Sequence, residues 1–448
     1  MKRLALTLAL AASLASNARS EAPAVNHVEG ALADGAAWVI DKPSNWNGTL
    51  LIWSHGYSAR LGPPLDAPSD VKAWVLAQGY ALAASSYARA GWALEQAVPD
   101  QIGVVQVFED RFGHPKRTIA WGDSMGGLVT LALAEQYPER ISGALAGCGP
   151  IAGAVGMMNM ALDGAFTFKT LLAPTSDIAL VHVSDDRQNA QRVQAVIDQA
   201  QGSPAGRARL ALASAMAQEA GWTDPKAAEP AAEDYDGRQV EAAKSFNMGV
   251  FLPRADQEAR AGGVFSWNTK VDYSAQLERS GKGSMVRALY AKAGLDLRSD
   301  LDALAKAPRI TADPAAVAYM AAHYSPSGDL RIPLLTMHTM GDGLTSVANE
   351  SAYAGYAKRA GRSANLAQIF VRGAGHCAFT PSEREAALKT LELRLDGAAW
   401  SLSPKTLRSR AAGADPAQVR FVAFSPPPFL RPYPTKPPLP AAGSKDHE

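Results

Sequence analysis

Short apolar runs alternate with longer amphipathic stretches in two separate parts of the chain. The short runs predict buried strands, because apolar stretches of this length bounded by turn residues are typical of a sheet interior. Stretches between them that end at glycine or proline predict helices. Alternation of the two indicates an α/β fold with a mostly parallel sheet flanked by helices. The predicted strands are 36–40, 49–53, 80–85, 117–120, 142–148, 332–338 and 367–371.

The alternation stops between about residues 149 and 331, where the pattern predicts helices and no core strand. We therefore expect a large helical cap, residues 150–330, inserted between strands 142–148 and 332–338, which we number as the sixth and seventh core strands of the complete fold. Residues 21–149 and 331–400 form the two parts of the core. Predicted cap helices are 186–200, 205–220, 284–293, 300–306 and 313–323.

The two ends of the chain differ from this body. Residues 1–20 combine Lys2-Arg3, a short apolar run and small residues, a pattern that predicts a cleavable signal peptide and a secreted or periplasmic protein. The apolar run is too short to cross a bilayer. Residues 21–33 are expected to be a loose N-terminus. Residues 401–448 are expected to be a proline-rich tail, either extended on the body or disordered.

Charge is nearly balanced over the 448 residues, with 44 basic and 43 acidic side chains and a net charge of +1. This balance argues against nucleic acid as a partner, and no basic run indicates an anionic membrane surface. No other stretch is long and apolar enough for an integral membrane segment. The sequence leaves the oligomeric state open.

The motif Gly122-x-Ser124-x-Gly126 lies between a predicted strand and a predicted helix, the context in which it marks a nucleophile. The sharp turn leaves no room for side chains two residues before and after the serine, and the two glycines remove those clashes. The amide of Met125 opens the helix and is our first candidate for an oxyanion donor. A second donor is expected from the loop after strand 49–53, where Gly56 permits close backbone approach and the amide of Tyr57 follows.

A serine hydroxyl needs a base, and the base needs an orienting acid. Of eight histidines, His376 alone follows the last predicted strand and precedes a helix, which makes it the predicted base. Asp342 follows the strand before that one and is the predicted acid. Asp123 is a weaker rival, since its side chain should point away from Ser124. Parallel strands bring these ends to one sheet edge.

Two further patterns bear on the site. Met157, Met158 and Met160 open the cap just after the sixth core strand, so they either line the substrate pocket or pack as ordinary helix core. The histidines and cysteines lack zinc spacing, so we expect no metal and no cofactor.

This constellation resembles the α/β-hydrolase fold superfamily over residues 30–150 and 330–398. More narrowly, it resembles secreted bacterial esterases and prolyl-oligopeptidase-like hydrolases, although the β-propeller of true prolyl oligopeptidases is absent. The narrower resemblance does not identify a substrate. The residues that carry it are Trp46-Asn47-Gly48-Thr49-Leu50, His55-Gly56-Tyr57, Gly79-Tyr80-Ala81-Leu82, Ser85-Ser86-Tyr87, Gly91-Trp92, Gly341-Asp342 and Gly375-His376-Cys377-Ala378-Phe379.

The resemblance implies an exported serine hydrolase that cleaves small-molecule or polymeric carboxylic esters through an acyl-enzyme. A peptidase or aminopeptidase of the same fold is the alternative, and it would need an acidic group in the cap to hold a substrate amine. A catalytically silent binding protein is the third possibility. In the resembled fold, Cys148 ends the strand beside the one that carries Ser124, and Cys377 adjoins His376. We therefore expect a disulfide between Cys148 and Cys377, with two packed free thiols as the alternative.

Overall fold

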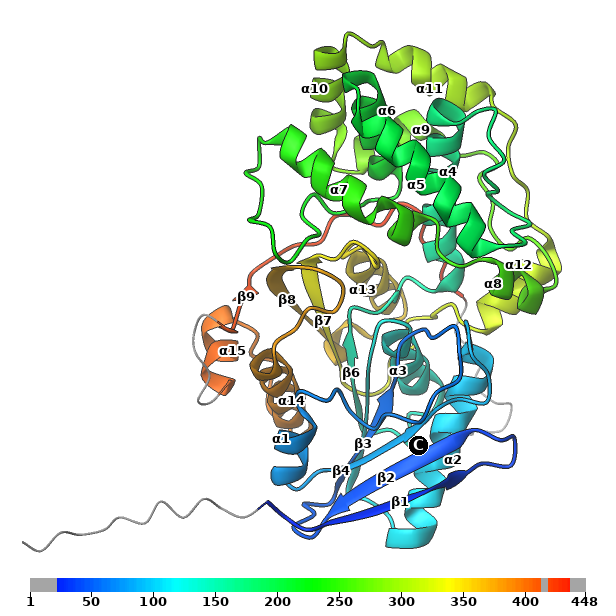
Figure 1. Cartoon of the computed structure of the whole chain (residues 1–448). Helices are drawn as coiled ribbons and strands as arrows, with labels where there is room; N and C mark the ends of the chain where they lie inside the picture. Colours follow the sequence, from blue (N-terminus) through cyan, green and yellow to red (C-terminus); the bar gives the residue numbers. More distant parts are fainter. Residues whose placement is uncertain (1–21, 412–417, 436–448) are drawn as a thin grey trace, which may run out of the picture.

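The computed structural model describes residues 22–411 and 418–435, so the predicted signal peptide lies outside the described residues (Figure 1). A nine-stranded sheet occupies the centre of the core, in the order β1-β2-β4-β3-β5-β6-β7-β8-β9. Strands β3 to β8 pair in parallel, whereas the β1–β2, β2–β4 and β8–β9 pairs are antiparallel. The strands are β1 Val25–Ala31, β2 Ala37–Pro43, β3 Thr49–Ser54, β4 Ala81–Ser85, β5 Arg117–Asp123, β6 Gly143–Gly147, β7 Leu334–Gly341, β8 Leu366–Ala374 and β9 Phe421–Val422.

Helices cover both faces of the sheet, and successive residues of a strand point to opposite faces. Leu50 and Ile52 of β3 belong to one buried cluster, which also holds residues of α2, α3 and α13. Leu51 and Trp53 point the other way and pack with residues of α1, α14 and α15. This period of two explains why residues 50–53 of β3 form a continuous apolar run. The core helices are α1 Lys72–Ala77, α2 Leu94–Phe112, α3 Met125–Gln136, α13 Asn349–Arg359, the short η1 Ser363–Asn365, α14 Pro381–Leu395 and α15 Pro404–Arg410.

The predicted helical insertion between the sixth and seventh strands is confirmed: nine described helices, α4 to α12, connect β6 to β7 and stand over one edge of the sheet (Figure 1). This cap has apolar clusters of its own, one around Phe166, Leu212 and Tyr290 and another around Phe168 and Phe246. The cap helices are α4 Ala154–Leu172, α5 Asp186–Gln201, α6 Pro204–Met216, α7 Tyr235–Val250, α8 Ala255–Ala261, α9 Tyr273–Arg279, α10 Gly283–Ala293, α11 Leu297–Lys306 and α12 Pro314–Ala322.

The chain after β9 runs back between the core and the cap. Phe429 N–H donates to Ser351 Oγ of α13 at 2.9 Å, and Leu430 N–H donates to Gln218 Oε1 beyond α6 at 2.9 Å. The guanidinium of Arg431 pairs with the fully buried Asp163 of α4 at 2.7 Å. The expected tail, residues 401–448, therefore contains helix α15 and strand β9, and only its described part after β9 is extended on the body, where it ties the cap to the core.

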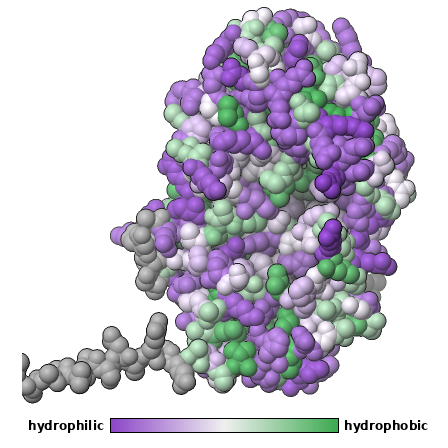
Figure 2. All heavy atoms as spheres, in the orientation of Figure 1, coloured by the Kyte–Doolittle hydropathy of each residue, from purple (hydrophilic) through white to green (hydrophobic). Residues whose placement is uncertain are grey.

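The N-terminal expectation was wrong. Residues Val25–Ala31 form an edge strand, β1, instead of a loose segment, and pair with all of β2. Nearly every β1 side chain is exposed, so the sequence carries no apolar alternation to reveal the strand. None of the described helices combines the length and apolarity that a bilayer crossing requires. Figure 2 shows hydrophilic and hydrophobic residues interspersed over the face drawn.

Candidate active site

Ser124 lies on a strained turn between β5 and α3. Its backbone has φ +60° and ψ −129°, a conformation that side chains other than glycine rarely adopt. A Cβ on Gly122 would lie 2.6 Å from the carbonyl oxygens of Ser54 and Gly126, and one on Gly126 would lie 2.8 Å from the carbonyl oxygen of His55. Glycine at both positions is therefore a steric requirement of the turn, as the motif predicts.

Ser124, His376 and Asp342 form one hydrogen-bonded chain. His376 Nε2 lies 2.8 Å from Ser124 Oγ, and His376 Nδ1 lies 2.8 and 3.0 Å from the two oxygens of Asp342. With Nδ1 donating to the carboxylate, Nε2 is left as an acceptor aimed at the serine hydroxyl. The three residues follow β5, β7 and β8, at the carboxyl edge of the parallel sheet.

Asp342 is buried and its carboxylate is fully engaged. Its Oδ1 accepts from the amides of Leu344 and Thr345 at 2.8 Å each, which orients the carboxylate independently of His376. A second imidazole, His338, lies behind it with Nε2 3.7 Å from Asp342 Oδ2.

His338 is fully buried in β7, next to the carboxylate of Asp342. Both of its ring nitrogens face acceptors: Glu350 Oε1 at 3.0 Å and the carbonyl of Thr345 at 2.9 Å. Burial disfavours the imidazolium, but the Glu350 and Asp342 carboxylates hold the pKa of His338 above its ordinary value. His338 is thus a packed core histidine of β7.

The rival acid, Asp123, points elsewhere. Its Oδ2 makes an ion pair of 2.6 Å with Arg384 of α14. Burial raises the pKa of Asp123 above its ordinary value, and the Arg384 guanidinium opposes that rise. Asp123 therefore belongs to a core contact between β5 and α14, and Asp342 alone orients His376.

Two backbone amides border the serine. Met125 is the first residue of α3, so its N–H has no acceptor within the helix. Within the described ranges the N–H of Tyr57 has no hydrogen-bond acceptor either. A Cβ built on Gly56 would lie 3.7 Å from Ser124 Oγ, so the loop that carries Tyr57 passes directly beside the hydroxyl. His55 supports this loop: its ring stacks on Tyr87 with centroids 4.0 Å apart.

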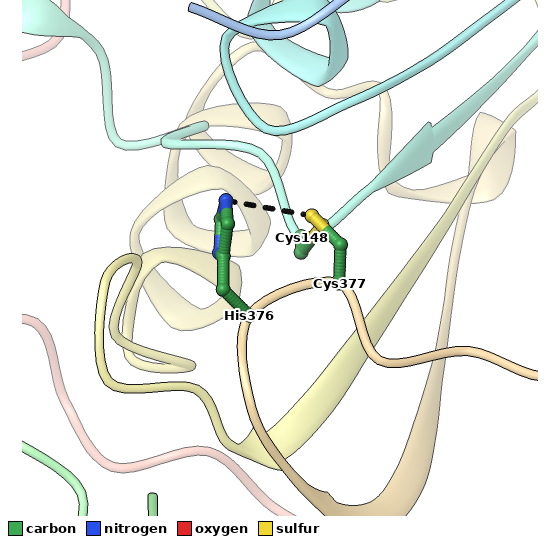
Figure 3. A group of neighbouring side chains, drawn as sticks. All are labelled: Cys148, His376 and Cys377. Carbon is green, nitrogen blue, oxygen red and sulfur yellow. Dashed lines mark hydrogen bonds between the residues drawn. A yellow bond between two sulfur atoms is a disulfide. The ribbon is translucent and has the colours of Figure 1, made fainter. Parts of the chain in front are cut away.

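The expected disulfide between Cys148 and Cys377 is present and lies beside the imidazole of His376 (Figure 3). Cys377 Sγ is 3.5 Å from His376 Nε2. The bond joins the end of β6 to the loop after β8. Although the two sulfurs and His376 are close enough for a metal site, bonded sulfurs supply no thiolate ligand.

A cavity of about 210 Å³ opens onto Ser124, and we name it the nucleophile cavity. Of the three methionines at the start of the cap, only Met157 lines it; Met158 and Met160 are not among its lining residues and are buried in the apolar cluster shared with the core. Its described lining residues are Tyr57, Trp92, Ser124, Met125, Pro150, Met157, Met248, Leu252, Pro253, Gln257, Leu344 and Thr345.

Sequence reasoning missed the cap residues of this cavity, Met248, Leu252, Pro253 and Gln257. They lie at the end of α7 and the start of α8, about 125 residues after Ser124 in the chain. The local pattern predicts helices in the cap but does not say which helix end faces the serine. Only the packing of the cap on the core decides that.

No protein-family model matches the chain. A curated relative, the o-phthalyl amidase of Xanthobacter agilis, is 29% identical over 437 residues, which cover 88% of this chain and 93% of the relative.

Among solved structures, the esterase Pf2001 of Pyrococcus furiosus is 14% identical, with a TM-score of 0.39, over 83% of this chain and 90% of the other. Feruloyl esterase B of Aspergillus oryzae is 15% identical, with a TM-score of 0.38, over 84% and 82%. An acylaminoacyl peptidase of Pyrococcus horikoshii is 10% identical, with a TM-score of 0.41, over 86% of this chain and 44% of the other.

The fold assignment rests on the chain's own geometry. The serine turn joins a parallel strand to a helix, the oxyanion-side loop follows β3, and the order along the chain is serine, aspartate, histidine. This order and context distinguish the arrangement from other serine triads. The expected fold class is therefore confirmed, and the chain has the α/β-hydrolase fold.

Proposed function

We propose that this chain is a serine hydrolase that cleaves carboxylic esters through an acyl-enzyme. The observation that carries the proposal is the continuous hydrogen-bonded path from Ser124 Oγ through His376 to Asp342. In this path His376 takes the serine proton as Oγ attacks the substrate carbonyl, and Asp342 stabilises the imidazolium that forms.

The amides of Tyr57 and Met125 donate to the tetrahedral oxyanion, and neither amide has to break another described hydrogen bond to do so. His376 then protonates the leaving alcohol, and the acyl group stays on Ser124. Water then attacks the acyl carbonyl while His376 takes its proton. As the second tetrahedral intermediate collapses, His376 gives that proton to Ser124 Oγ, and the carboxylic acid leaves. No step needs a group beyond these residues and water.

The nucleophile cavity supports a compact apolar substrate group next to the scissile carbonyl. Its lining contains methionine, leucine, proline and tryptophan side chains and, among the residues described, no aspartate or glutamate. A free α-amino group would find no carboxylate there. The lining therefore disfavours the aminopeptidase alternative.

Amide hydrolysis is a second candidate, favoured by the name of the o-phthalyl amidase relative, which spans most of both chains. The same triad serves both reactions, and they differ in how hard the leaving group is to expel. An amine departs only after protonation, so an amidase depends more strongly on proton delivery from His376.

Matched pairs decide between the two: 4-nitrophenyl acetate against 4-nitroacetanilide, and 4-nitrophenyl benzoate against the corresponding anilide. Each kcat/KM is divided by the rate of alkaline hydrolysis of the same compound, which removes intrinsic reactivity. An esterase accelerates the esters at least as strongly as the anilides, whereas an amidase accelerates the anilides more. If the Ser124→Ala variant retains the activity, or the wild type hydrolyses neither class, the proposed function is wrong.

We also propose that the protein is exported. The charged, apolar and small-residue pattern of residues 1–20 and the Cys148–Cys377 disulfide support an oxidising compartment. Expression with and without residues 1–20, followed by fractionation and mass determination of the N-terminus, tests this. Full-length protein that stays in the cytoplasm with an uncut N-terminus would contradict it.

A further inference from the structure

A second cavity, of about 340 Å³, begins beside Ser124, and we name it the arginine cavity. Tyr57 lines both this cavity and the nucleophile cavity. Gly56 also lines it, and a Cβ on Gly56 would be 3.7 Å from Ser124 Oγ. The two cavities therefore meet at Tyr57, close to Ser124, and a substrate long enough to pass Tyr57 would reach both.

Two loops form the cavity and are tied to each other. One runs from His55 to Leu65 and the other from Ser86 to Gly91. The amide of Gly91 donates to the carbonyl of Ser58 at 2.7 Å, and the two residues form an isolated antiparallel bridge. This bridge fixes the spacing between the two walls, so a ligand meets a preformed groove.

Each wall carries one arginine, Arg60 on the first loop and Arg89 on the second. Within residues 22–411 and 418–435, neither guanidinium makes an ion pair or a hydrogen bond. Their positive charges are therefore not neutralised by carboxylates of the described chain. His55, which also lines the groove, adds no charge because burial lowers its pKa below the ordinary value.

One carboxylate beside this groove is already paired with a cation. Asp256 lies under Gly91, where its Oδ2 accepts from the amide of Trp92 at 2.8 Å. Both of its oxygens also accept from Arg260 Nε, at 3.0 and 2.9 Å. With Asp256 paired in this way, Arg60 and Arg89 leave the groove with an excess of positive charge.

The rest of the lining is largely apolar, with Leu61, Pro63, Leu65 and the rings of Tyr57 and Tyr87. Leu61 and Leu65 are 59% and 60% exposed, an unusual placement for leucine beside a catalytic candidate. An apolar groove with two arginines fits a hydrophobic group that ends in an anion. Guanidinium groups bind planar carboxylates through paired N–H donors, which makes carboxylate the best-matched anion.

We propose that the arginine cavity binds a carboxylate on the substrate, so that the enzyme prefers esters or amides carrying a second, free acid group. The proposal rests on the proposed function and narrows its substrate class. Binding involves no covalent step: the carboxylate stays ionised, and the scissile carbonyl remains at Ser124.

The test compares two pairs of esters of nearly equal size, in which one member carries a carboxylate and the other a neutral group at the same position. In the first pair the acyl side varies: mono-4-nitrophenyl glutarate against 4-nitrophenyl hexanoate. In the second pair the leaving group varies: 4-acetoxybenzoate against 4-acetoxybenzamide. Each kcat/KM is divided by the alkaline hydrolysis rate, and the anionic-to-neutral ratio is measured for the wild type, Arg60→Gln, Arg89→Gln, the double variant and the control Arg287→Gln on the distant α10.

We expect the wild type to favour the anionic member of at least one pair. In the double variant the anionic-to-neutral ratio of that pair should be about tenfold lower, which is the effect expected for the loss of two exposed ion pairs. Sodium chloride should lower the wild-type ratio because both arginines are solvent-accessible. Arg287→Gln should keep the wild-type ratio. No anionic preference in either pair, or a preference that survives in the double variant, overturns the proposal.

The two proposals fail in different ways. A wild type that a fluorophosphonate does not label at Ser124 contradicts the serine hydrolase itself. A wild type that is labelled at Ser124 and turns over neutral esters, but shows a ratio insensitive to both arginines, contradicts only the carboxylate site.

Discussion

Breaking the Cys148–Cys377 disulfide should lower both stability and turnover. The bond closes a loop with a sequence separation of 229 residues. In the chain-entropy description, a loop of that length restricts the unfolded chain by about 5 kcal/mol. Unfolding entropy is about 2.1 cal/mol/K per residue, which for a chain of 448 residues is about 0.9 kcal/mol/K. Loss of the bond should therefore lower Tm by about 5 °C.

Turnover should fall because Cys377 adjoins His376 in the chain and its sulfur lies 3.5 Å from the imidazole. Without the bond, the loop after β8 is no longer attached to the end of β6. Displacement of a catalytic group by about 1 Å costs on the order of a hundredfold, so we expect kcat to fall ten- to hundredfold with a smaller change in KM.

The assay measures Tm by calorimetry and 4-nitrophenyl ester hydrolysis well below the transition, for the wild type before and after reduction. The matched control is the Cys148→Ala/Cys377→Ala variant, which should resemble the reduced wild type and be insensitive to the reductant. If reduction leaves both Tm and kcat unchanged, the bond neither stabilises the fold nor positions His376.

Further variants test three other parts of the structure. Asp342→Asn should lower kcat by about 10³ to 10⁴, because the amide cannot stabilise the imidazolium; Asp123→Asn should cost less than about tenfold while lowering Tm, since it unpairs the partly buried Arg384. If Asp123→Asn lowers kcat more than Asp342→Asn does, the acid that orients His376 is Asp123. Met157→Trp should narrow acyl-chain preference in an ester-length series, whereas Met160→Trp should mainly lower Tm; identical length profiles for Met157→Trp and the wild type would place Met157 in the core only. Burial raises the pKa of Glu219 to about 8. The folded state thus retains a proton that the unfolded state releases above its lower pKa, and stability falls as pH rises toward 8. Glu219→Gln should raise Tm more at pH 8 than at pH 5, and an equal gain at both values would contradict the shift.

The core strands and the juxtaposition of Ser124, Asp342 and His376 could be predicted because their signals are local. Gly122 and Gly126 are needed because the turn around Ser124 has no room for a Cβ at either position. His376 and Asp342 each follow an apolar strand, and these strands end at the same edge of the sheet. The capping box of α14 is also a local feature, because Thr380 and Glu383 lie three residues apart and each side chain accepts from the other's backbone amide.

The features that escaped prediction depend on contacts between distant segments. β1 is mostly exposed and gains its structure from pairing with β2. β9 has only two residues, and it exists because Phe421 and Val422 meet the edge of β8. Ser299 resembles a helix cap, yet α11 begins earlier, where Asp296 accepts from the amides of Arg298 and Ser299. Gln257 and Met248 reach the nucleophile cavity only through the packing of α7 and α8 over the core.

The central claim is that Ser124 is the nucleophile and carries the acyl group. Intact mass measurement of the wild type after brief exposure to a fluorophosphonate tests it most directly, with peptide mapping of the adduct and Ser124→Ala as the control. We predict one adduct per chain, located on Ser124, loss of hydrolysis in step with labelling, and no adduct in a folded Ser124→Ala variant. An unlabelled wild type that still hydrolyses its substrate, or an adduct that persists in Ser124→Ala, would contradict the claim.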